Sequence, residues 1–94
     1  MVPVDLFGHV VDHDRIDPLV SRAGVPLLVD AAESLGSRYA GRPAAGFGDL
    51  AAVSFNGNKI MTTSGGGALL CDDAATAKRA GYLASQARQP AKHY

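Results

Sequence analysis

Residues 25–36, VPLLVDAAESLG, carry the clearest indication of the fold class. Its apolar part, residues 26–30, is short and partly β-branched and shows no polar alternation. Such a run is typical of a strand buried on both faces of a parallel sheet. Asp30 ends this strand, and the residues after it predict a single helical turn at residues 31–35.

Three further segments share the character of this strand, namely Val2–Leu6, Ala51–Phe55 and Ala68–Cys71. The segment between the second and third strands, residues 36–50, is rich in Gly and Pro and is predicted to be an irregular loop. Strands separated by helical or irregular connections of this length predict βαβ units and therefore an α/β fold.

Two helices are predicted. Residues 15–23 carry apolar side chains at helical spacing, with Asp14 or Asp17 as the candidate N-cap and Gly24 as the stop. The second helix runs from Ala74 to Arg88 and is ended by Pro90. Its packing stripe consists of Ala77, Ala80, Leu83, Ala84 and Ala87.

Two helices are too few for this sheet. Four strands that are buried on both faces need helices on both sides of the sheet, and the sequence predicts only two substantial helices. An apolar face would stay uncovered. We therefore expect the 94 residues to be part of a larger domain, or to need a partner chain that covers this face.

Composition excludes several classes of function. Nine Lys and Arg balance nine Asp and Glu, so the net charge of zero gives no general attraction to nucleic acid. The single cysteine, Cys71, cannot form an internal disulfide, which favours a reduced, cytoplasmic protein. No apolar run approaches the length of a membrane span. We expect neither nucleic acid nor membrane as a partner.

Candidate chemistry lies where two strands end. The carboxyl ends of parallel strands form the ligand-binding edge of an open α/β sheet, and here they present Asp30, Ser54 and the nearby Lys59. Lys59 has no acidic residue within nine positions along the sequence, which favours an amine that reacts over one that forms an ion pair.

Each of these residues also has a plain structural interpretation. Lys59 could be a solvated surface lysine, Asp30 a helix N-cap, and Ser54 a hydroxyl bonded to its own backbone. The functional alternatives are an imine-forming amine, an anion that keeps a ring nitrogen protonated, and a phosphate ligand.

A loop near the N-terminus contains His9, Asp12, His13 and Asp14. They precede a helix and have no further ligand nearby in the sequence, so we interpret them as solvated polar residues and a helix cap. No metal site is predicted.

The order of motifs resembles the DegT/DnrJ/EryC1/StrS family of sugar aminotransferases. The segments that carry the resemblance are VPVDLFGHVVDHD, VPLLVDAAESLGSRYAGRPAAGFGD, AAVSFNGNKIMTTSGGGALLCDD and YLASQARQPAKHY, which cover essentially the whole chain. SFNGNKIMTTSGGG, residues 54–67, is similar to the branch that acts at C4 of UDP-linked 4-keto-6-deoxy sugars in bacillosamine pathways.

The resemblance implies a fold-type-I enzyme that depends on pyridoxal 5'-phosphate. Residues 1–94 would then be part of the large domain, a mostly parallel sheet with flanking helices, without that domain's N-terminal part and without the small C-terminal domain. Lys59 would be the Schiff-base lysine, Asp30 the carboxylate at the pyridine nitrogen, and Ser54 a ligand of the cofactor phosphate. Glu33 matches a Gln or Glu near the cofactor ring.

Two functional hypotheses follow. In the first, the chain carries the core of a nucleotide-sugar aminotransferase that takes its amino group from an amino acid, glutamate, and works as a homodimer. In the second, the chain is a truncated, non-catalytic remnant with weak cofactor binding or none. Dependence of cofactor binding on Lys59 distinguishes them.

Overall fold

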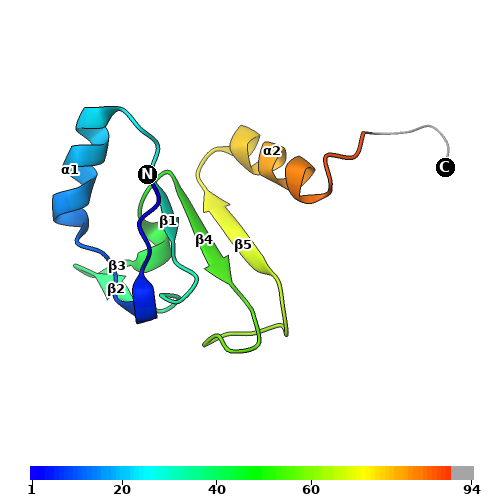
Figure 1. Cartoon of the computed structure of the whole chain (residues 1–94), viewed down its shortest axis with the longest axis horizontal. Coiled ribbons are helices and arrows are strands. Elements are labelled where there is room, and N and C mark those ends of the chain that lie inside the picture. The colour runs from blue at the N-terminus through cyan, green and yellow to red at the C-terminus, as the bar shows by residue number, and fades with distance from the viewer. Residues whose placement is uncertain (90–94) are drawn as a thin grey trace.

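A mixed three-stranded sheet forms the centre of the molecule (Figure 1). The computed structural model of the chain describes residues 1–89. The strands β1 (Leu28–Asp30), β4 (Leu50–Ser54) and β5 (Gly67–Cys71) lie in the order β1-β4-β5. β1 and β4 are parallel, whereas β4 and β5 are antiparallel. The α/β class with flanking helices is confirmed, with a mixed rather than mostly parallel sheet in the described residues.

The predicted first strand, Val2–Leu6, is reduced to an isolated parallel bridge between Val4 and Asp30. The Asp30 N–H donates to the Pro3 carbonyl at 2.9 Å, and the Asp5 N–H donates to the Asp30 carbonyl at 3.0 Å. A longer ladder does not form because Pro3 has no N–H to donate and residues 6–8 turn into a 3₁₀ helix, η1 (Leu6–Gly8).

The first helix, α1, spans His13–Ala23 and begins two residues earlier than predicted. Its N-cap is Asp12, whose side chain accepts a hydrogen bond from the Arg15 N–H at 3.2 Å, so the prediction of Asp14 or Asp17 was wrong. The earlier start brings His13 into the helix, where it is buried. Gly24 ends the helix in the left-handed conformation, as predicted.

Residues 31–50 contain more regular structure than the sequence predicts. A turn replaces the helical turn expected at 31–35, with the Ser34 N–H donating to the Ala31 carbonyl. A small hairpin follows, formed by β2 (Arg38–Tyr39) and β3 (Arg42–Pro43), and then the 3₁₀ helix η2 (Ala44–Gly46). Ala40 and Gly41 both have positive φ, which is the backbone geometry of a tight two-residue hairpin turn.

The hydrophobic core lies between α1, the first two strands of the sheet and the segment after η2. Its buried side chains come from residue 20, residues 27–31 and residues 47–53, so the core joins α1 to both parallel strands. The members are Val20, Leu27, Val29, Ala31, Phe47, Ala51 and Val53.

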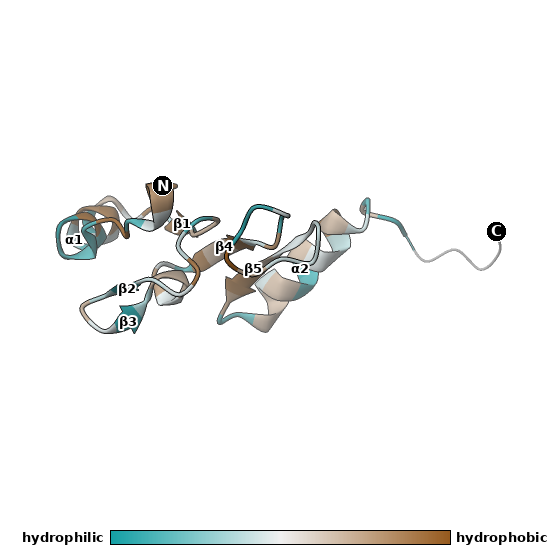
Figure 2. Ribbon diagram, turned by 90° about the horizontal axis from the view of Figure 1, so that it is seen from below, coloured by the Kyte–Doolittle hydropathy of each residue, from teal (hydrophilic) through white to brown (hydrophobic). Residues whose placement is uncertain are grey.

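The C-terminal helix, α2 (Ala74–Ala84), follows β5 but has no buried residue. It ends at Ala84, earlier than the predicted Arg88, and Gln86 and Ala87 both have positive φ. Pro90, the predicted helix stop, lies outside the described residues. Figure 2 colours β5 as hydrophobic, and its Leu69 and Leu70 are 41% and 43% exposed. Leu83 of the predicted packing stripe is 53% exposed. The expectation of an uncovered apolar surface is confirmed for these residues.

Within residues 1–89, neither helix has the length and hydropathy needed to cross a membrane.

Candidate functional site

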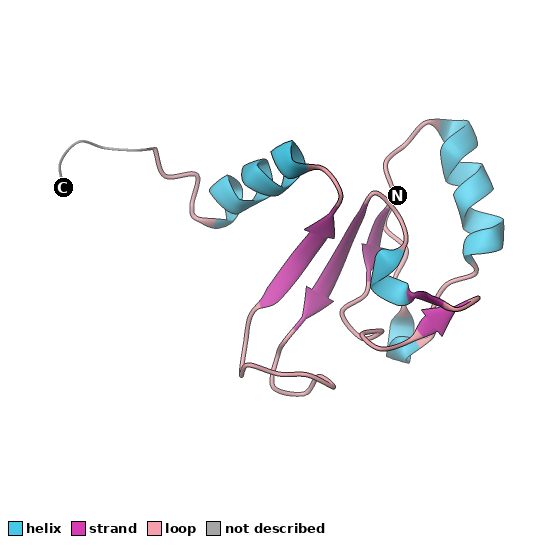
Figure 3. Ribbon diagram, turned by 180° about the vertical axis from the view of Figure 1, so that it is seen from behind, coloured by secondary structure: helices cyan, strands magenta, loops and turns pink. Residues whose placement is uncertain are grey.

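The candidate site lies at the end of the sheet where β1 and β4 terminate. Because β1 and β4 are parallel, their last residues, Asp30 and Ser54, reach the same edge. The loop of residues 55–66 leaves β4 at this edge and returns into β5, at the end of these strands opposite α2 (Figure 3). A pocket of about 220 Å³ opens here, lined by Phe7, Ala32, Glu33, Leu35, Ser54, Asn58, Lys59 and Ile60.

Lys59 is held on the wall of this pocket by the backbone of its own loop. The Lys59 N–H donates to the Asn56 carbonyl at 3.0 Å. The first and last residues of the loop are joined by a hydrogen bond of 2.9 Å from the Phe55 N–H to the Gly66 carbonyl. The Lys59 side chain is only 17% exposed, so most of it is covered by neighbouring protein atoms.

The Lys59 amine does have an acidic neighbour, contrary to the interpretation from sequence. Its Nζ lies 3.9 Å from Oε1 of Glu33. The other carboxylate oxygen of Glu33 accepts a hydrogen bond of 2.6 Å from the Phe7 N–H. Glu33 therefore connects the N-terminal turn to the lysine loop, a contact between segments that lie far apart in the sequence.

Phe7 forms the rim of the pocket and is unusual in two respects. Its φ of 54° places a non-glycine residue in the left-handed region. Its ring is 88% exposed, although it is a large apolar side chain. The Phe7 N–H donates a hydrogen bond to Glu33, and Phe7 lines the same pocket as Lys59.

Ser54 lines the same pocket, whereas Asp30 does not. The Ser54 Oγ accepts a hydrogen bond of 3.3 Å from the Asn56 N–H. The Asp30 carboxylate is half-buried and accepts a hydrogen bond of 3.1 Å from the Ala32 N–H. Of the four residues predicted for the site, the structure thus brings Lys59, Glu33 and Ser54 into one pocket and leaves Asp30 at the adjacent strand end.

Two buried polar residues below the site escaped the sequence analysis. Asp5 and Ser34 are both fully buried, and the Ser34 hydroxyl donates to Oδ2 of Asp5 at 2.7 Å. A carboxylate enters a protein interior only with hydrogen-bonding partners. No local pattern signals this pair, because the two residues lie in different segments.

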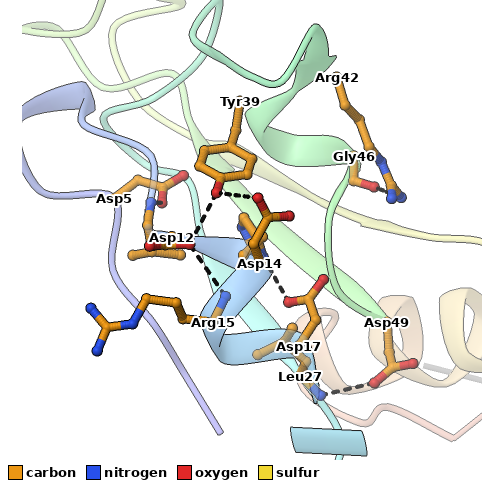
Figure 4. Close-up of polar contacts among 12 residues, drawn as sticks. Asp5, Asp12, Asp14, Arg15, Asp17, Leu27, Tyr39, Arg42, Gly46 and Asp49 are labelled. Carbon is orange, nitrogen blue, oxygen red and sulfur yellow. Dashed lines mark hydrogen bonds and ion pairs between the residues drawn. The ribbon is translucent and has the colours of Figure 1, made fainter. Parts of the chain in front are cut away.

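A second polar cluster surrounds the start of α1 (Figure 4). The Tyr39 hydroxyl lies 3.0 Å from Oδ1 of Asp12 and 3.0 Å from Oδ2 of Asp14 and shares its proton with them. Burial, followed by these hydrogen bonds to two carboxylates, raises the pKa of Tyr39 to about 12. The contact connects the β2–β3 hairpin to the first turn of α1.

His13 in this cluster is not the solvated residue expected from the sequence. It is 2% exposed, its ring stacks on Phe47 with centroids 3.9 Å apart, and its Nδ1 lies 2.9 Å from Oδ1 of Asp17. His13 is therefore part of the packed interior. In residues 1–89 no group of three or more His, Cys, Asp or Glu side chains has the arrangement of a metal site.

Several known proteins with similar sequences are named as aminotransferases. The chain is 50% identical over 94 residues to a Bacillus subtilis (strain 168) protein assigned as the pyridoxal phosphate-dependent aminotransferase EpsN, and the match covers 100% of this chain and 24% of that protein. It is 36% identical to GDP-perosamine synthase of Caulobacter vibrioides, with 100% and 25% of the two chains covered. The chain spans about a quarter of the length of these relatives.

A solved structure has the same fold over most of the chain. The structure of DesI in the presence of its TDP-sugar product superposes with a TM-score of 0.83 at 36% identity, and the match covers 89% of this chain and 21% of DesI. The fold of most of this chain is therefore found within a much longer protein.

The residues at the pocket fit pyridoxal phosphate. The cofactor has an aldehyde that needs an amine, a phosphate that needs hydrogen-bond donors, and a ring nitrogen that pairs with a carboxylate. Lys59 and Ser54 offer the amine and the hydroxyl from one pocket, and Asp30 offers a carboxylate at the adjoining strand end. The amine, the hydroxyl and the carboxylate thus correspond to the aldehyde, the phosphate and the ring nitrogen of the cofactor.

The family assignment covers every residue. The model of the DegT/DnrJ/EryC1/StrS aminotransferase family matches residues 1–94. This match, the relatives and the fold agree with one another, and they imply pyridoxal phosphate as the cofactor. The chain belongs to the DegT/DnrJ/EryC1/StrS aminotransferase family.

Proposed function

We propose that the chain provides the lysine and part of the cofactor site of a pyridoxal phosphate-dependent sugar aminotransferase. The single observation that supports this most directly is the pocket that Lys59, Glu33 and Ser54 share at the carboxyl end of β4. In this proposal residues 1–94 form part of the large catalytic domain, and the active unit is a homodimer. The lone Cys71 favours the cytoplasm as its location.

The proposal gives distinct roles to Lys59, Ser54 and Asp30. Lys59 binds the cofactor covalently through its amine and moves the proton during amino transfer. The Ser54 hydroxyl donates to the cofactor phosphate, and the Asp30 carboxylate holds the proton on the ring nitrogen. The bound cofactor supplies an electron-accepting ring that stabilises negative charge at the reacting carbon.

Glu33 lies beside the reactive amine and anchors it. Its Oε2 accepts a hydrogen bond from the Phe7 N–H, and its Oε1 is the oxygen near the Lys59 amine. A carboxylate fixed in this way orients the amine toward the pocket before the cofactor binds, and it stays near the cofactor ring afterwards.

For the substrate we propose a UDP-linked 4-keto-6-deoxy sugar, with glutamate as the amino donor. The support is the sequence of residues 54–67 around Lys59, together with relatives that include GDP-perosamine synthase and a protein solved with a TDP-sugar product. These names share a nucleotide-linked sugar and differ in the nucleotide. Uridine is supported by the resemblance of residues 54–67 and by a 34% identical relative from Pseudomonas aeruginosa, a UDP-2-acetamido-2-deoxy-3-oxo-D-glucuronate aminotransferase.

The experiment adds pyridoxal phosphate to the chain and follows the visible absorbance of the covalently bound cofactor. Native chain should develop the band, Lys59→Ala should not, and the control Lys78→Ala on α2 should behave like the native chain. Borohydride reduction and mass spectrometry should place the pyridoxyl group on Lys59. A band that survives in Lys59→Ala would refute the role of Lys59. No band in any variant would favour a non-catalytic chain.

The role of Asp30 has a separate test. Asp30→Ala should retain borohydride-trapped cofactor on Lys59, because the amine is intact, yet lose amino transfer from glutamate to the cofactor. Amino transfer that continues in Asp30→Ala would contradict the assignment of this carboxylate to the ring nitrogen.

A further inference from the structure

The buried carboxylate of Asp5 lies beneath the segment that carries Glu33. Its Oδ2 accepts the Ser34 hydroxyl at 2.7 Å, and its Oδ1 accepts the Val11 N–H at 3.0 Å. Both Asp5 and Ser34 have no exposure to solvent. A buried carboxylate is stable only where hydrogen bonds satisfy it, so this pair fixes the residue next to Glu33 with little freedom.

Two further contacts join the same two segments. The Ser37 hydroxyl donates to the Gly8 carbonyl at 2.8 Å. The Phe7 N–H donates to Oε2 of Glu33 at 2.6 Å. The backbones are close enough that a Cβ on Gly8 would lie 3.1 Å from the Glu33 carbonyl oxygen. Residues 5–8 and 33–37 are thus held together by contacts at Glu33, Ser34 and Ser37.

We propose that Asp5 is a positioning residue that holds the Glu33 carboxylate beside the Lys59 amine. It acts through Ser34, which it binds directly, and through the turn at residues 6–8, which supplies the Phe7 N–H. With Oε2 occupied by that N–H, Oε1 is left 3.9 Å from the Lys59 Nζ. The functional meaning of this inference rests on the proposed function, in which Lys59 is the reactive amine.

The contact between Glu33 and Lys59 has a measurable chemical consequence. An amine held by a carboxylate must leave that contact before its nitrogen can attack an electrophile. Because Glu33 is 38% exposed, the pair is screened and its contribution is modest. We expect release of Glu33 to raise the rate at which Lys59 is acylated by about twofold to fivefold, the range of a partly exposed ion pair.

The test measures Lys59 without any cofactor. A short pulse of acetic anhydride labels the amines of the full chain, and mass spectrometry gives the labelling of Lys59 relative to exposed Lys78 on α2. Glu33→Gln should raise this ratio by about twofold to fivefold. Ser34→Ala should raise it nearly as much, because the Asp5 carboxylate loses its partner and the segment moves. Glu33→Gln combined with Ser34→Ala should show no further increase.

Matched variants separate positioning from loss of stability. Asp5→Asn should keep the native ratio, since its amide can donate to the Ser34 Oγ while its oxygen still accepts from Val11. Asp49→Ala removes the carboxylate that accepts the Leu27 N–H at the opposite end of β4, so it should lower stability without changing the ratio. If Ser34→Ala does not fold, Ser37→Ala is the milder variant and should raise the ratio by a smaller factor.

The inference is overturned if the labelling of Lys59 relative to Lys78 is unchanged in both Ser34→Ala and Ser37→Ala. It is equally overturned if Ser34→Ala raises the ratio further in the Glu33→Gln background, because Asp5 would then not act through Glu33. These outcomes are independent of the proposed function. A chain that shows the acylation changes but binds no pyridoxal phosphate on Lys59 refutes the proposed function and leaves the positioning role of Asp5 intact.

Discussion

The N-terminal and C-terminal parts of the sheet differ in how well they are covered. β1 and β4 contribute Val29, Ala51 and Val53 to a core closed by α1 and Phe47. On the other side, β5 leaves Leu69 and Leu70 41% and 43% exposed, and α2 buries no residue. The apolar pattern of a segment therefore shows its capacity for burial, whereas actual burial depends on what packs against it.

The site lies at the boundary between these two parts. Glu33 and Ser54 come from the covered part, whereas Lys59 lies on the loop that leads to β5. The packed core therefore fixes the acceptors and donors of the site, and the antiparallel pairing of β4 with β5 fixes the lysine loop.

The largest difference between the two parts should appear on truncation of large apolar side chains. Phe47→Ala removes a ring that is 8% exposed and stacked on His13, so the free energy of unfolding should fall by about 3–5 kcal/mol. The matched change Leu83→Ala on α2, at 53% exposure, should cost less than about 0.5 kcal/mol. Urea unfolding followed by circular dichroism measures both, and equal losses of stability would show that the two parts are equally well packed.

The second largest effect concerns the coupling of β5 to β4. A Cβ at Gly67 would lie 2.5 Å from the Val53 carbonyl oxygen, so Gly67→Ala should force the strands apart and lower stability by about 1–3 kcal/mol. Gly65→Ala is the control, because a Cβ there meets nothing within 4 Å. If urea unfolding shows the same small loss for both variants, β5 is not tightly coupled to the core.

A smaller effect on stability, confined to alkaline pH, is expected in the covered part of the molecule. The folded-state pKa of Tyr39 is raised to about 12 from 10.0. Its contribution to stability is therefore complete below pH 10 and is lost as the pH rises from 10 toward 12. Tyr39→Phe should remove that loss from the pH dependence of the urea midpoint. Tyr82→Phe on α2 is the control, and an identical pH dependence in native chain and Tyr39→Phe would contradict the assignment.

The smallest effect should appear at acidic pH in the exposed part. Hydrogen bonds from Thr76 lower the folded-state pKa of Asp73, the N-cap of α2, below its ordinary 3.8. The cap's contribution is present above pH 3.8 and is lost as the pH falls below it. Asp73→Ala should reduce helical circular dichroism at neutral pH and weaken its further acid loss. Asp72→Ala, one residue before the cap, should keep the native profile.

Much of the fold was predictable because its signals are local. The apolar runs locate β4 and β5 to within one residue, and Gly24 predicts the end of α1. The direction of β5 was not predictable, since a strand's orientation depends on which neighbour it pairs with. The early start of α1 was missed because the burial of His13 against Phe47, which favours it, is a contact between distant segments.

The candidate site was predictable in part of its lining but not in its contacts, and the predicted Asp30 lies outside the pocket. Lys59, Ser54 and Asp30 follow from the rule that ligands bind at the carboxyl ends of parallel strands. The contact of Lys59 with Glu33 depends on how the turn at residues 31–37 folds against residues 5–8. Sequence spacing holds no information on such a contact, so Lys59 was expected to stand without an acidic neighbour.

The antiparallel pairing of β4 with β5 also bears on how this site can diverge. Ser54 and Gly67 are paired residues of neighbouring strands, so residues 55–66 leave the sheet and return to it at one place. A change in the length or composition of this excursion moves Lys59 and the pocket wall without altering the register of the strands. Sequence changes within residues 55–66 can therefore reshape this pocket almost independently of the sheet.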